Sequence, residues 1–164
     1  MAPRVTIPTG QCELLIRVNA LRLLRDRSIE TAAASIEVPR LDDSKRIQQG
    51  AREYAEMCAG CHLSPASRDS ETRRGLNPEP PDFYRQRVQP RRAFWVAKHG
   101  VKMSGMPAWG PTHDNDTIWS IVAFLQKMPD LDVEGYRTMA THTEAEPAPS
   151  HSHSHGGASH SHSR

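Results

Sequence analysis

The chain has 164 residues, of which 37% are hydrophobic, and its 21 lysines and arginines nearly balance 19 aspartates and glutamates. This length suits one domain with terminal extensions, and a net charge of +2 argues against a dedicated nucleic-acid-binding protein. Three cysteines are too few for a disulfide scaffold, and the sequence lacks the roughly 18 consecutive apolar residues of a membrane-spanning helix.

An N-terminal extension covers residues 1–40. Its leucine-rich segment from Glu13 to Arg27 favours a helix, and the arginines within that segment argue against a secretory signal sequence. Val38-Pro39 ends this regular structure, because a residue before proline disfavours the helical conformation. We interpret the extension as partly helical and as a truncated export or anchor region through which the protein associates with a membrane.

Residues 41–131 form the central domain. Asp42-Asp43-Ser44 is a helix start signal, and apolar residues at helical spacing follow it up to Cys58. The segment from Leu63 to Gln89 holds four prolines and few apolar residues, which predicts a long irregular loop with a function.

Two more helices are predicted in the second half of this domain. Pro90 suits the first turn of a short helix that Gly100 ends. Asp114 is a favourable N-cap for the last helix, whose apolar residues recur at helical spacing until Pro129. No segment shows the alternation of a strand, so the domain is predicted to be all-α.

A C-terminal tail covers residues 132–164 and is predicted to be disordered and histidine-rich from about residue 141. Its alternating histidines offer imidazoles to a divalent cation such as Cu²⁺, Ni²⁺ or Zn²⁺. A pH-sensitive tail without a metal remains the alternative. The candidate ligands are His151, His153, His155, His160 and His162.

The pentapeptide Cys58-Ala-Gly-Cys61-His62 is the most informative motif. A zinc site needs two more ligands, and only Cys12 remains as a further cysteine. A thioredoxin-like redox pair belongs in a strand–helix context, which this sequence lacks. A chance CxxC without a cofactor is a third alternative. Covalent attachment of a c-type haem accounts for both cysteines and for the adjacent histidine as an iron ligand.

The sixth iron ligand decides what such a haem does. Met106 is the preferred candidate, because Gly105 permits close backbone approach and Pro107 fixes the segment in which it lies. Methionine raises the reduction potential and closes the iron to other ligands. Met103, His99 and an open coordination position are the alternatives.

The CxxCH of Cys58–His62, the Gly-Met-Pro-Ala-Trp of Gly105–Trp109 and the closing helix resemble mono-haem class I cytochromes c over Asp42 to Leu131. The resemblance implies the all-α class I cytochrome c fold: three to five short helices around one covalently attached haem c, with flexible extensions at both ends.

The resemblance also implies roles for individual residues. Gly50 and Tyr54 match the contact between the first and last helices, where Trp119, Ile121 and Val122 would face them. Pro78 lies in a proline-containing loop whose backbone carbonyl would accept the Nδ1–H of the axial histidine. The implied cofactor-binding residues are Cys58, Cys61, His62, Met106, Pro78, Tyr54 and Trp109.

The function implied is that of an electron carrier rather than an enzyme, working with redox partner proteins in the periplasm or from a membrane anchor facing it. A haem enzyme with an open distal site, either a peroxidase or a small-molecule reductase, is the alternative. Seven arginines between Arg68 and Arg92 would steer an acidic partner, unless the neighbouring acids cancel their field.

Overall fold

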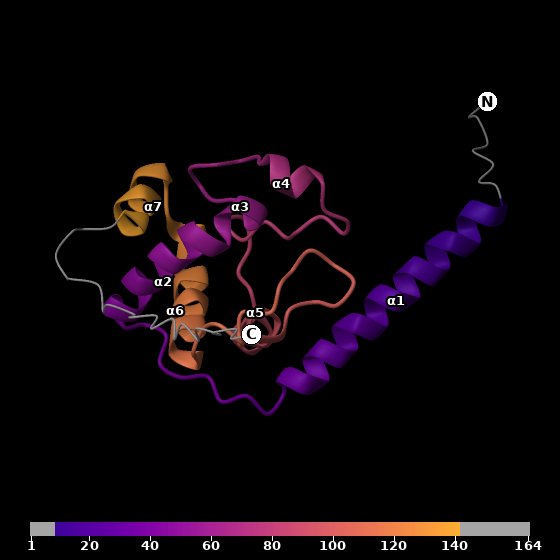
Figure 1. Ribbon diagram of the computed structural model, residues 1–164, viewed down its shortest axis with the longest axis horizontal. Coiled ribbons are helices and arrows are strands. Elements are labelled where there is room, and N and C mark those ends of the chain that lie inside the picture. The colour runs from indigo at the N-terminus through magenta and orange to yellow at the C-terminus, as the bar shows by residue number, and fades with distance from the viewer. Residues whose placement is uncertain (1–8, 142–164) are drawn as a thin grey trace, which may run out of the picture.

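The computed structural model describes residues 9–141, with side chains from residue 19 onward. This part of the chain contains seven α-helices and one 3-10 helix and no β-strand, as predicted (Figure 1). Five of the α-helices lie within residues 41–131, in agreement with the three to five expected. The elements are α1 Thr9–Ala33, α2 Ser44–Met57, α3 Ala59–His62, α4 Glu71–Arg74, α5 Pro90–His99, α6 Asn115–Lys127, η1 Met128–Asp130 and α7 Val133–Ala140.

The predicted helix ends are confirmed. Asp43 caps α2 by accepting a hydrogen bond from the backbone N–H of Arg46 at 2.8 Å. Asp114 caps α6 in the same way, accepting from the N–H of Thr117 at 2.7 Å. Pro90 occupies the first turn of α5, and Gly100 ends that helix with a φ of +68°, which glycine adopts without strain.

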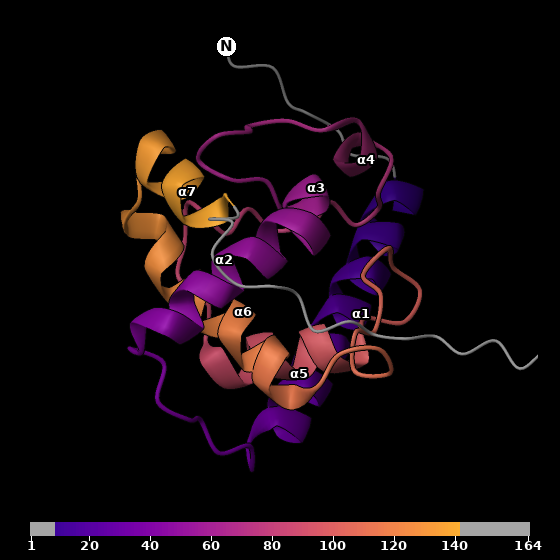
Figure 2. The ribbon, with the colours of Figure 1, turned by 60° about the vertical axis from the view of Figure 1, so that its left-hand side comes forward.

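Helices α2 and α6 cross in direct backbone contact (Figure 2). A Cβ atom on Gly50 would clash with the carbonyl oxygen of Ser120, so only glycine permits this approach. The rings of Tyr54 and Phe124 meet beside the crossing with their centroids 5.5 Å apart. The small residue and the aromatic residue predicted at this contact are therefore confirmed.

The expectation for the opposite side of the crossing is only partly correct. Ile121 shares the apolar cluster of Tyr54. Trp119 and Val122 instead face α5, where Trp119 stacks on Phe94 with ring centroids 4.1 Å apart. The helical repeat explains the difference, because three residues within one turn cannot all lie on the same face.

Helix α7 lies within residues 132–164, the segment predicted as the C-terminal tail, and it packs against α2. Tyr136 is buried in the cluster that contains Tyr54, and Gln48 on α2 donates a hydrogen bond to the Met139 carbonyl at 2.9 Å. The described part of the predicted tail is thus folded onto α2. The histidines from His151 onward lie outside the described residues.

Helix α1 lies in the N-terminal extension, which was predicted to be partly helical. The C-terminal part of α1 contacts the domain: Ile29 and Ala33 are buried there, and Asp26 pairs with Arg92 on α5 at 2.8 Å. The rest of α1 projects away from the other helices in Figure 1, with the side chains of Leu21 and Leu24 exposed. Within the described residues, no helix has the length and apolar character needed to cross a membrane.

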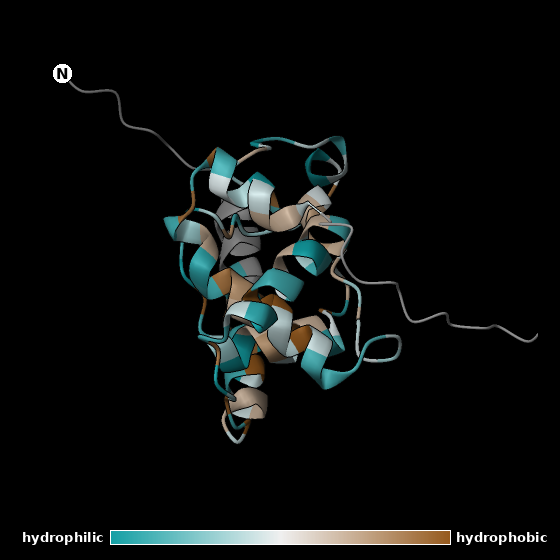
Figure 3. Cartoon of the chain, turned by 90° about the vertical axis from the view of Figure 1, so that its left-hand side faces the viewer, coloured by the Kyte–Doolittle hydropathy of each residue, from teal (hydrophilic) through white to brown (hydrophobic). Residues whose placement is uncertain are grey.

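The hydrophobic core lies between α2, α5, α6 and α7. Figure 3 shows the hydrophobic segments gathered where these helices meet, and hydrophilic segments facing outward. The Leu63–Gln89 segment forms an irregular loop that contains only the single turn of α4, as expected. It runs past the end of α2 and α3, and it thereby positions the candidate site.

Candidate haem-attachment site

The CxxCH motif forms a tight helical turn at the end of α2. Cys58 ends α2 and begins α3, and its carbonyl accepts hydrogen bonds from the backbone N–H groups of Cys61 at 3.1 Å and His62 at 2.9 Å. Both cysteines are free thiols and are partly exposed. Residues three apart lie on one side of a helical turn, so the two thiols are available on the same side.

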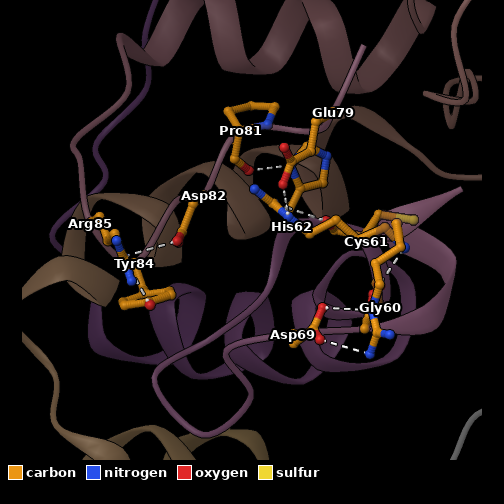
Figure 4. Close-up of polar contacts among 12 residues, drawn as sticks. Gly60, Cys61, His62, Asp69, Glu79, Pro81, Asp82, Tyr84 and Arg85 are labelled. Atoms are coloured by element: carbon orange, nitrogen blue, oxygen red, sulfur yellow. Dashed lines mark hydrogen bonds and ion pairs between the residues drawn. The ribbon is translucent and has the colours of Figure 1, made fainter. Parts of the chain in front are cut away.

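The His62 imidazole is held on two sides. Its Nδ1–H donates to the carbonyl oxygen of Pro81 at 2.9 Å (Figure 4), and its ring lies parallel to that of Phe83 at 4.4 Å between centroids. Among the described residues, Nδ1 makes the ring's only hydrogen bond, which leaves Nε2 as a lone-pair donor. Burial lowers the pKa of His62, and this favours the neutral ring that a metal requires.

The carbonyl expected from Pro78 is instead that of Pro81. The loop contains prolines at 78, 80 and 81, and the turn of α4 precedes them, so the proline pattern alone does not select which carbonyl reaches His62. Pro78 is exposed. Phe83 was not among the residues predicted for the site, although an aromatic residue two positions after the last proline of the run was an available signal.

The thiols do not resemble a reactive redox pair. Burial, followed by the nearby Cys61, raises the pKa of the Cys58 thiol to about 12, so this thiol holds its proton at neutral pH. The surrounding structure is a helix–helix junction rather than a strand and a helix. Among the described side chains, those of residues 19–141, no three His, Cys, Asp or Glu groups gather as a metal cluster.

Tyr54 on α2 contacts the residue that follows the CxxCH motif. Its side chain is fully buried, and its hydroxyl donates to the carbonyl of Leu63, the residue after His62, at 2.6 Å. Burial raises the pKa of Tyr54 far above its ordinary value. The contact ties the end of α3 to α2 and Phe124, so Tyr54 supports the site from the core side.

The Met106 segment packs against the end of α5. A Cβ on Gly100 would lie 2.8 Å from the backbone of Pro107 and Ala108, and the N–H of Val101 donates to the Met106 carbonyl at 3.1 Å. Met106 is half-buried, whereas the side chains of Met103 and His99 are exposed. Of the three candidate sixth ligands, Met106 alone is partly enclosed.

Trp109 fixes the far end of the same segment. Its backbone N–H donates to the Ala97 carbonyl on α5 at 3.0 Å, and its half-buried ring meets the edge of the His113 ring at 5.4 Å between centroids. The loop that carries Met106 is therefore attached to α5 at both ends.

The arginines of the loop and α5 are mostly paired with acids, which argues against a strong positive field. Five of the seven have an acidic partner within 4 Å; the other two are Arg68, which is exposed, and Arg91, which bonds the Ala34 carbonyl. The ion pairs are Arg73–Glu79, Arg74–Asp69, Arg85–Asp82, Arg87–Asp130 and Arg92–Asp26. Neighbouring acids thus cancel most of the charge that was expected to steer a partner.

Residues 45–125 match the family model described as cytochrome C oxidase, cbb3-type, subunit III. The match runs from the first turn of α2 to the last turns of α6, and it includes both the CxxCH turn and the Met106 segment. The domain is a class I cytochrome c. No curated protein matches the chain. A cytochrome c domain implies haem c, and the two free thiols together with the available Nε2 of His62 fit that group.

Proposed function

We propose that the chain is an electron carrier containing one haem c, attached through Cys58 and Cys61 and ligated by His62 and Met106. The observation that carries the proposal is the His62 ring, which is buried, directed by Pro81 and Phe83, and available through Nε2. The Pro81 carbonyl satisfies the buried Nδ1–H and leaves Nε2 as the ring atom that can bind iron.

When bound, haem c supplies an iron that gains or loses a single electron. The chain's own residues limit what changes in that step. The Pro81 carbonyl keeps the proton of His62 on Nδ1, and the attachment of the Met106 loop to α5 holds the methionine segment in place. Ligands held in this way would move little between the two oxidation states, and binding by both His62 and Met106 would leave no position on the iron for a substrate.

Met106 is proposed as the sixth ligand over Met103 and His99. The exposed fraction of Met103 is 101%, so its thioether points into solvent. His99 is exposed at the end of α5, where its ring contacts Trp95 with centroids 4.9 Å apart. Either alternative would require rearrangement of the Gly100–Met106 segment.

The test compares Met106→Ala with Met103→Ala in the purified haem protein. We expect the sulfur-to-iron charge-transfer absorption of the oxidised wild type to vanish in M106A and to persist in M103A. Rapid binding of cyanide should appear only in M106A, because that variant opens a coordination position. Rapid cyanide binding by the wild type, with no charge-transfer band, would contradict the proposal and favour a haem enzyme.

The matching family's description names an oxidase subunit, and we propose that this chain exchanges electrons with redox proteins that include a terminal oxidase. We infer a location in the periplasm, or on a membrane surface facing it, from the proposed covalent attachment of haem. Mass spectrometry of the protein isolated from its native cells tests both points of this assignment. The expected mass includes one haem adduct, and the native N-terminus shows whether an export segment or anchor precedes residue 1.

A further inference from the structure

Asp82 lies between the two residues that hold the His62 ring, Pro81 and Phe83. Its side chain is only 17% exposed, and its Oδ1 atom is buried without a hydrogen-bond partner among the described residues. Its Oδ2 atom lies 3.2 Å from the guanidinium of Arg85 (Figure 4). The carboxylate therefore has one partner for two oxygens.

Arg85 neutralises the negative charge of the Asp82 carboxylate only in part. The Arg85 side chain is 68% exposed, and the same Nε–H also donates to the Tyr84 hydroxyl at 2.9 Å. Water screens an exposed cation more strongly than it screens a buried anion. Arg73, the neighbouring cation on this loop, pairs instead with Glu79 at 2.7 Å. The Arg73 side chain is 14% exposed and that of Glu79 is 67% exposed, so this pair leaves a positive charge near the site, whereas the Asp82 carboxylate, whose one partner is an exposed cation, contributes a negative charge.

A buried carboxylate oxygen without a partner costs free energy, and no contact among the described residues offsets that cost. Tyr54 on α2 also lies near this charge, because Asp82 is one of the groups that raise the pKa of Tyr54. Tyr54 in turn contacts the residue that follows His62. Asp82 thus lies next to Pro81 and Phe83, which contact His62, and near Tyr54, which contacts Leu63.

We propose that the Asp82 carboxylate lowers the reduction potential of the iron bound at His62, an inference that rests on the proposed function. Oxidised iron carries one more positive charge than reduced iron, and a nearby buried anion stabilises the oxidised form. In the step itself, one electron passes from a redox mediator to ferric iron, which becomes ferrous. No bond forms or breaks, and no proton is transferred.

The test is an equilibrium redox titration of the haem protein against a mediator, comparing Asp82→Asn with Arg85→Gln. D82N removes the anion with little change in shape, and we expect the ratio of reduced to oxidised protein to rise roughly two- to tenfold at a fixed mediator potential. R85Q leaves the anion without its cation, so its shift should have the opposite sign.

Asp69→Asn is the matched control, because Asp69 belongs to the same loop and pairs with Arg74 while both side chains are exposed, at 60% and 71%. The ratio of reduced to oxidised protein in D69N should stay within twofold of the wild-type ratio. The pattern of hyperfine-shifted haem methyl resonances in the NMR spectrum should remain the same in D82N, because the His62 ring keeps its orientation.

A structural role for Asp82 gives a different result. Loosening of the loop would shift D82N and R85Q in the same direction and change the haem methyl pattern, and either outcome overturns the proposal. So does a D82N shift no larger than that of D69N. If D82N fails to fold, R85Q provides the test, since Arg85 is mostly exposed. A lower ratio of reduced to oxidised protein in R85Q supports the proposal, and a higher ratio overturns it. A wild type without covalent haem overturns the proposed function as well, whereas a normal haem spectrum with an unmoved potential overturns this inference alone.

Discussion

The imidazole of His62 and the phenyl ring of Phe83 lie nearly parallel, with an interplanar angle of 13° and 4.4 Å between their centroids. Their positions in the sequence differ by 21, and the long proline-containing loop brings them together. With the Pro81 carbonyl fixing Nδ1, the stack determines the direction in which Nε2 points.

Replacing Phe83 by leucine should alter the site and not only the stability. F83L keeps an apolar side chain but loses the ring stack, which is worth about 0.5–1.5 kcal/mol beyond buried area. We expect a change in the hyperfine-shifted haem methyl resonances of the oxidised protein together with that loss of unfolding free energy.

The control for this substitution is F94L, because Phe94 and Trp119 stack at 4.1 Å with the same interplanar angle of 13°. This variant should lose stability while its haem spectrum remains that of the wild type. Identical spectra for F83L and the wild type would show that Phe83 does not orient His62.

Substitution of Gly50 by alanine should separate α2 from α6. The added methyl group would clash with the Ser120 carbonyl, a backbone atom that cannot move aside alone. Overpacking of this kind costs about 1–3 kcal/mol or more, which chemical denaturation would measure. Gly60→Ala is the matched control, since a Cβ at Gly60 meets no atom within 4 Å, and its stability should equal or slightly exceed the wild type.

The N-cap of α6 should make stability depend on pH. The backbone N–H of Thr117 holds the pKa of Asp114 below its ordinary value of 3.8, so the carboxylate is the form that the folded state prefers. A lowered folded-state pKa gives stability that is present above pH 3.8 and is lost as the pH falls through the folded-state pKa. D114A should therefore cost about 0.5–2 kcal/mol near pH 7 and progressively less in acid.

Asp114→Asn keeps a side chain that can cap α6 but removes its negative charge. Asparagine caps helices about as well as aspartate, so D114N should keep most of the stability at pH 7. Its unfolding free energy should vary less with acid than that of the wild type. An equal acid dependence in both proteins would mean that Asp114 contributes no pH-linked stability.

Tyr136 should be necessary for the stability of the domain, although it follows the segment matched to the family. It is 6% exposed and contacts Phe124 with ring centroids 6.2 Å apart. Truncation of a buried aromatic residue to alanine costs about 3–5 kcal/mol. Val133→Ala on the same helix removes a partly exposed side chain and should cost far less; equal losses would contradict the packing of α7 onto α2.

Features that depend on neighbouring residues were predictable from the sequence. The caps at Asp43 and Asp114 and the end of α5 at Gly100 depend on local backbone chemistry, and the CxxCH turn is a contiguous motif. The Gly50 contact between the first and last helices required the family resemblance, because nothing in the local sequence identifies its partner.

Features that depend on distant residues were not predictable. The choice of Pro81 over Pro78 depends on how the whole loop returns to His62. Helix α7 is short, and burial of Tyr136 against α2 and α6 stabilises it more than its own sequence pattern does. The pairing of Arg87 with Asp130, 43 positions along the chain, likewise appears only in the folded structure.

The crossing of α2 and α6 also sets an order of events during synthesis. It joins segments 71 residues apart, as the Gln49–Ser120 contact shows, and the Cys58–His62 turn directly follows α2. Both thiols therefore leave the ribosome well before the helix that packs against α2 exists. During synthesis the turn that carries both thiols therefore has no packed core behind it until the last helix is complete.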